Sequence, residues 1–120
     1  MADISTIVGA GLIAEATSAA PGVCTLTIPV SAVPNTTIWL DGYIISASAA
    51  PAAAVVWTIT GAATTIHQNI PANAFAPIGY SFGTRPLPAQ LNQALVLSCP
   101  SLGGTAISTI TAFYHYGPLV

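Results

Sequence analysis

The chain has 120 residues but only four charged side chains, Asp3, Glu15, Asp41 and Arg85, which make up 3% of the sequence. An ordinary soluble domain is about 25% charged. One arginine, no lysine and a net charge of −2 cannot neutralise the roughly 6–10 phosphates of a usual DNA contact, so the composition excludes nucleic-acid binding. A phosphate-handling enzyme would also lack its cationic clamps. The length fits one domain with a single core.

The first 22 residues differ from the rest of the chain. Four apolar side chains recur near helical spacing: Ile4, Ile7, Val8 and Leu12. The spacing predicts either a short amphipathic helix or an extended arm that docks on a neighbouring molecule. Asp3 stands where a secretory signal would carry Lys or Arg, so we expect no signal peptide. We therefore divide the chain into an N-terminal arm or short helix, residues 1–22, and a β domain, residues 23–120.

The remainder of the chain has the pattern of an all-β protein. Strands are predicted at residues 23–30, 37–48, 53–60, 64–70, 75–83, 94–99 and 105–116. They are separated by turns rich in Gly and Pro, and no intervening segment is long enough for the crossover helix of a parallel sheet. The uncharged stretch 44–66 is interrupted by Pro51 and Gly61, so no transmembrane helix is expected. The sequence predicts an antiparallel β-sandwich or jelly roll.

The two cysteines, Cys24 and Cys99, both fall in predicted strands. A disulfide between them would close a long loop and stabilise the fold by about 4 kcal/mol. Because no signal peptide is expected, we favour two buried free thiols and keep the disulfide as the alternative.

No residue pattern indicates catalysis. His67 and His115 could join Asp41 and a serine in a Ser-His-Asp arrangement, but the chain has no G-x-S-x-G elbow. We interpret both histidines as strand residues that pack or form hydrogen bonds. No histidine, cysteine or carboxylate pair stands at metal-ligand spacing, so no catalytic residue, metal site or cofactor is predicted. The Asp41-Gly42 pair indicates a bulge or bend in its strand, and an ion pair of Asp41 with Arg85 is a second interpretation.

Several residues are candidates for contact with a partner. Arg85, followed by Pro86, is either an internal partner or an interface anchor. Tyr114 and Tyr116 share one face of the last strand, which is a contact surface or a carbohydrate-stacking platform if it points outward. The candidate interface comprises Ile4, Ile7, Val8, Leu12, Arg85, Tyr114 and Tyr116.

The order of strands and turns from Trp39 to Tyr116 resembles a known family. The segment DGYIISASAAPAAAVVWTITG leads on to APIGYSFGTRPLPAQLNQALVLSCPSLGGTAISTITAFYHY. It is similar to the small β-sandwich proteins that decorate or cement the capsids of tailed bacteriophages. The resemblance implies a structural virion protein without enzymatic activity or cofactor, and a homotrimer that binds the major capsid protein. It also implies synthesis in the host cytoplasm and a final place on the capsid surface, with no membrane or nucleic-acid partner.

The low charge fits such a role, because charges are dispensable in permanent contacts and costly when buried without a partner. Two alternatives stay open. One is a tail, fibre or head-completion protein of a phage, and the other is a lectin-like carbohydrate-binding sandwich.

Overall fold

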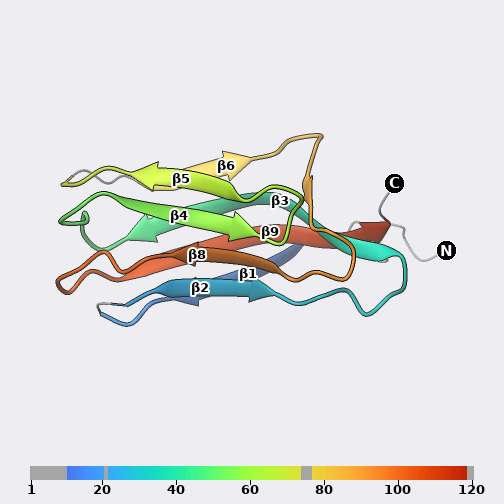
Figure 1. Ribbon diagram of the computed structural model, residues 1–120, viewed down its shortest axis with the longest axis horizontal. Coiled ribbons are helices and arrows are strands. Elements are labelled where there is room, and N and C mark those ends of the chain that lie inside the picture. The colour runs from blue at the N-terminus through green and yellow to red at the C-terminus, as the bar shows by residue number, and fades with distance from the viewer. Residues whose placement is uncertain (1–10, 21, 74–76, 119–120) are drawn as a thin grey trace.

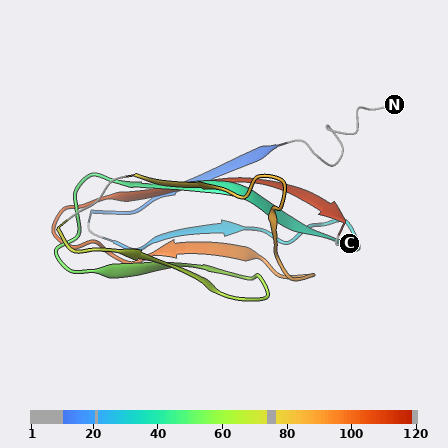
Figure 2. The same ribbon diagram turned by 90° about the horizontal axis from the view of Figure 1, so that it is seen from above.

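The computed structural model describes residues 11–20, 22–73 and 77–118. Within these residues it contains nine strands, no helix, and two antiparallel sheets packed face to face (Figures 1 and 2). Sheet A contains β1 (Leu12–Thr17), β3 (Thr36–Ala47), β6 (Ile78–Ser81), β7 (Leu87–Pro88) and β9 (Ser108–Pro118). Sheet B contains β2 (Cys24–Ile28), β4 (Val55–Thr60), β5 (Ile66–Ile70) and β8 (Leu95–Cys99). The predicted all-β, antiparallel sandwich is confirmed.

The strand order identifies the sandwich as a jelly roll. Sheet A runs β1-β9-β3-β6, with β7 also pairing with β3, and sheet B runs β2-β8-β4-β5. Leaving out the short β7, the antiparallel pairs are nested: first with last, second with second last, and so inward to β4 with β5. This wrapping of one long hairpin into two sheets is the jelly-roll arrangement.

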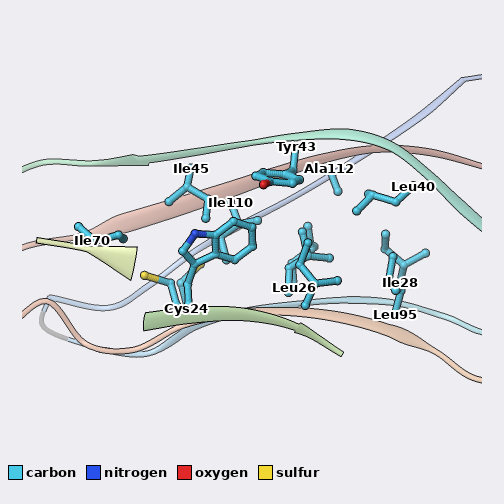
Figure 3. Close-up of a cluster of buried hydrophobic side chains, with 14 of the residues drawn as sticks. Cys24, Leu26, Ile28, Leu40, Tyr43, Ile45, Ile70, Leu95, Ile110 and Ala112 are labelled. Carbon is cyan, nitrogen blue, oxygen red and sulfur yellow. The ribbon is translucent and has the colours of Figure 1, made fainter. Parts of the chain in front are cut away.

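The core lies between the sheets and is filled by the alternate residues that strand geometry directs inward. In β2 the buried residues Cys24, Leu26 and Ile28 alternate with exposed threonines. Figure 3 shows Leu40, Tyr43 and Ile45 facing the side chains of β2 and β8 across this space. Trp57 is fully buried, and its ring meets that of Tyr43 edge-on at 4.8 Å between centroids.

Asp41 is the extra residue of a β-bulge in β3. Leu40 pairs with Tyr114 and Gly42 with Phe113, so two steps along β3 match one step along β9. Before the bulge the inward residues are even-numbered, as at Leu40, and after it they are odd-numbered, as at Tyr43. The predicted bulge is therefore confirmed, and it lets both halves of a 12-residue strand bury their apolar side chains.

The N-terminal segment is described only from residue 11 onward. Residues 12–17 form a strand that pairs with β9, not a helix, and Ala14 and Ala16 pack against the core from this strand. Ile4, Ile7 and Val8 of the predicted arm or helix lie outside the described residues. No helix in the described part of the chain is long and apolar enough to cross a membrane.

Candidate functional site

The candidate site lies on the outer face of sheet A, at the bulge of β3. On one edge of β3, β6 pairs with Gly42–Ile45 and β7 pairs with Trp39 and Leu40. The chain between β6 and β7, residues 82–86, passes the bulge as a loop, and its first amide, on Phe82, donates to the Asp41 carbonyl at 2.9 Å. A turn closed by the Arg85 amide and the Phe82 carbonyl, 3.1 Å apart, leaves Arg85 exposed beside the bulge.

A carboxylate, an imidazole and an indole meet beside this loop. The His115 Nδ1–H donates to Oδ2 of Asp41 at 2.8 Å, and both side chains are partly exposed. Trp39 is opposite His115 in the β3–β9 register, and the two rings lie nearly parallel with centroids 6.4 Å apart. The Trp39 Nε1–H donates to the Gly117 carbonyl at 3.3 Å. Asp41 is thus held by His115, and its side chain remains 35% exposed.

An open depression of about 490 Å³ lies next to Asp41. Gly42 and Gly79 leave its floor without side chains, because they occupy adjacent strands at the positions where larger residues would fill it. A side chain at Gly42 would also place its Cβ 2.7 Å from the Tyr80 carbonyl oxygen of the paired strand β6, so this position requires glycine. Ile44, Ser81 and Phe113 line the sides. The depression therefore combines an apolar lining with a carboxylate at its rim.

The same face carries an apolar band that we call the sheet-A stripe: Ile13, Phe113 and Ile44. Ile13 pairs with Phe113 on the neighbouring strand, and Phe113 lies next to Gly42 on the strand beyond, so the band crosses β1, β9 and β3. Ile13 is 68% exposed and Ile44 41% exposed. Apolar side chains grouped on a surface make it a candidate contact site.

The predicted interface residues are not brought together in one place. Leu12 is exposed at the start of β1, and Arg85 is exposed in the loop after β6. Tyr114 and Tyr116 are partly buried and pack against the core, and the Tyr116 hydroxyl donates to the Pro29 carbonyl at 2.9 Å. Their shared face therefore points inward, which leaves no outward tyrosine platform on β9. Ile4, Ile7 and Val8 lie outside the described residues.

The second interpretation of Asp41, an ion pair with Arg85, is not what the structure shows. Within residues 11–20, 22–73 and 77–118, the partner of Asp41 is His115. The strand alternation could not reveal this contact, because it depends on the long-range register that aligns β3 with β9. The break in alternation at Asp41-Gly42 was the local signal that a side chain is turned outward there.

The cysteines stand directly opposite each other in the β2–β8 ladder, both buried and both free thiols. Burial raises the pKa of the Cys24 thiol above its usual range, and it raises the pKa of Cys99 in the same way. The Cys24 thiol donates to the Ala16 carbonyl of β1 at 3.2 Å. Both groups therefore behave as small core residues, as the favoured interpretation holds.

The described part of the chain contains no cluster of three or more His, Cys, Asp or Glu side chains that could hold a metal ion. His67 is exposed on β5. The Asp41–His115 contact supplies two members of a triad, and no serine hydroxyl in the described segments is hydrogen-bonded to His115.

Comparison with known proteins concerns the fold. No protein-family model and no curated protein matches this sequence. One similar solved structure is a ruminal GH26 endo-beta-1,4-mannanase, with 13% sequence identity, coverage of 90% of this chain and 19% of that chain, and a TM-score of 0.33. Another is the virus-like particle of the giant freshwater prawn Macrobrachium rosenbergii extra small virus, with 10% identity, coverage of 87% and 77%, and a TM-score of 0.29. The chain thus spans about a fifth of the mannanase chain (19%), and at these scores neither likeness carries a functional argument.

Proposed function

We propose that this chain is a structural virion protein that decorates or cements a phage capsid. In this role it assembles as a homotrimer and binds across subunits of the major capsid protein on the outside of the head. The observation that carries the proposal is the surface, which is almost uncharged and, in addition to the apolar side chains buried between the two sheets, exposes large apolar side chains. They are Leu12, Ile13, Val23, Val30, Val33, Ile44, Val56, Tyr80, Leu91 and Ile107.

The physical argument starts from what such a surface does in water. A free monomer normally keeps its apolar surface in small patches and relies on charge for solubility. Here Glu15, Asp41 and Arg85 are the charged side chains in the described part of the chain. A permanent assembly covers apolar and neutral polar groups without having to desolvate charges. Many simultaneous weak contacts then supply the affinity.

The jelly-roll fold is compatible with a binding role. It does not by itself identify the binding partner, because one fold hosts many functions. The resemblance of residues 39–116 to capsid-decorating sandwiches selects the capsid over other assemblies. The tail, fibre and head-completion roles share the same surface argument, so the experiment must distinguish positions on the particle.

The test is to locate the chain on intact particles. Particles purified from cells that carry its gene are labelled with a specific antibody and imaged by electron microscopy. We expect the label on the capsid surface, and we expect the purified chain to co-sediment with undecorated shells. Label confined to the tail would establish the alternative role, and absence of the chain from particles would overturn the proposal.

A further inference from the structure

We propose that Arg85 of one copy of this chain binds in the depression at Asp41 of a second copy, and that this contact joins the copies of the homotrimer. The inference rests on the proposed function, because it names the contact that would hold the proposed trimer together. The partner is a second copy of the same chain, recognised by a cationic side chain that enters an apolar, acidic pocket.

Charge complementarity is the first argument. The sequence contains one arginine, Arg85, and no lysine. The side chain of Arg85 is exposed. In the described residues it forms no ion pair. The Asp41 side chain is 35% exposed and contacts His115 through Oδ2. Two opposite charges are thus presented to solvent in a chain that has very few of either sign.

The position of the two groups is the second argument. The loop with Arg85 and the bulge with Asp41 lie on the same edge of β3, joined by the hydrogen bond between Phe82 and Asp41. In Figure 1 the chain after β6 extends beyond the end of that strand and then turns back, and β7 pairs with Trp39 and Leu40 of β3. A rotation axis beside this edge would bring each Arg85 to the depression of the next copy. Such a head-to-tail contact closes into a cyclic trimer when the rotation between neighbouring copies is about 120°.

The chemistry of the depression is the third argument. A guanidinium pairs with a carboxylate through paired hydrogen bonds, and its flat face packs well on aromatic rings. Asp41 offers the carboxylate, and Phe113 and Ile44 offer an apolar wall for the stem of the side chain. Arginine in a partly desolvated pocket is a frequent centre of binding energy at interfaces.

One ion pair does not make a stable interface, which usually buries about 800 Å² on each partner. The sheet-A stripe supplies apolar area around the pocket, because Phe113 and Ile44 belong to both and Ile13 extends the band. The contact therefore has an anchoring side chain at its centre and apolar area beside it.

The first test measures the trimer by sedimentation equilibrium in four variants with matched charge changes. Arg85→Gln and Gln90→Glu both lower the net charge of −2 by one, and Asp41→Asn and Glu15→Gln both raise it by one. We expect Arg85→Gln and Asp41→Asn to raise the trimer dissociation constant by about tenfold or more. The controls Gln90→Glu and Glu15→Gln should leave it unchanged, and circular dichroism checks that each variant is folded. Equal effects of the variants and their controls would overturn the inference.

A second test separates contact between copies from contact within one chain. Asp41→Cys protein is mixed with tagged Arg85→Cys protein, and the mixture is treated with a short bismaleimide. We expect a cross-linked pair of one tagged and one untagged chain, and no such product when either single variant is treated alone. Because each substitution weakens the proposed contact, the mixture is cross-linked at concentrations where sedimentation shows that it is assembled. If no cross-linked pair forms there, Arg85 does not reach the Asp41 of another copy, and the inference is wrong.

The inference and the proposed function fail separately. If Arg85→Gln leaves the trimer dissociation constant unchanged and the protein still binds shells, only the Arg85 contact is overturned. A trimer that depends on Arg85 but is absent from particles overturns the capsid role alone. Arg85→Gln protein that is monomeric should still bind shells, but more weakly, because the three linked sites are lost.

Discussion

Cys24 and Cys99 are expected to make the stability of this protein decrease at alkaline pH. Both thiols are buried, and burial raises the pKa of each above the ordinary value of 9.0. Unfolding moves them into water, where they ionise at that ordinary value. The folded state therefore holds their protons more tightly than the unfolded state does. Their contribution to stability is complete below about pH 9 and is lost as the pH rises towards the folded pKa. Tyr43, whose pKa burial raises from 10.0, acts in the same direction at higher pH.

We expect the free energy of unfolding to stay level up to about pH 9 and to fall between pH 9 and pH 11. Urea unfolding followed by Trp fluorescence at several pH values measures the effect. The variant with both Cys24→Ala and Cys99→Ala serves as the control, and its stability should fall less steeply over the same range. An unchanged free energy of unfolding at pH 11 would contradict the expected burial of the thiols.

At the scale of elements, β3 depends on the extra residue at its centre. Asp41 allows Ile38 and Leu40 on one side, and Tyr43 and Ile45 on the other, to face the core. A shift of one residue turns every side chain of a strand to the opposite face. Deleting Asp41 would therefore expose the buried residues of one half of β3, at about 1.5–3 kcal/mol for each large apolar side chain.

Deletion of Asp41 is expected to abolish cooperative thermal unfolding. Asp41→Asn preserves the chain length, so this variant should still unfold cooperatively. Near-ultraviolet circular dichroism during heating distinguishes the two. A deletion variant with the melting temperature of the parent would show that the bulge is not needed to align β3 with β9.

Gly61, directly after β4, is the second element-level constraint. Its φ is +104°, and a Cβ there would lie 2.1 Å from the Ala94 carbonyl oxygen. Gly61→Ala should therefore cost the backbone strain of about 1–3 kcal/mol and, in addition, the displacement of the chain before β8. Gly104→Ala is the matched control, because φ is +59° and nothing lies within 4 Å of the added Cβ. Chemical denaturation should show the larger loss in free energy of unfolding for Gly61→Ala. Equal losses in the two variants would mean that the backbone at Ala94 can move aside at little energetic cost.

The strands could be predicted because alternation is a local signal, and the segments found at β2, β4 and β8 all show it. β1 could not be predicted, because the adjacent Leu12 and Ile13 and the small inward residues Ala14 and Ala16 give no clear period. The nested strand order depends on contacts far apart in the chain, which no local pattern records. The contact of Asp41 with His115 could not be predicted either, because it also depends on residues far apart in the chain. The bulge at Asp41 could be predicted from the sequence.

At the scale of the whole molecule, the few charges contribute differently to folding and to the proposed assembly. The core contains apolar side chains with Ser18, Thr37 and Ser108 as its buried polar residues. The only contact between an acidic and a basic side chain in the described segments, the hydrogen bond between Asp41 and His115, is partly exposed. Coulombic terms therefore contribute little to folding. The proposed trimer contact is different, because Arg85 and Asp41 stand at its centre.

Salt should consequently act on assembly and leave folding nearly unchanged. Raising NaCl from 0.01 to 1 M shortens the Debye length from about 30 to about 3 Å and screens exposed charges. We expect the urea midpoint of the Arg85→Gln variant, measured at concentrations where sedimentation shows it to be monomeric, to stay the same within error across this range. The dissociation constant of the parent trimer, measured by sedimentation equilibrium, should rise with salt because screening weakens the attraction between Arg85 and Asp41. A trimer that tightens with salt would show that apolar contact outweighs the ion pair, and a salt-dependent urea midpoint would mean that charges stabilise the fold itself.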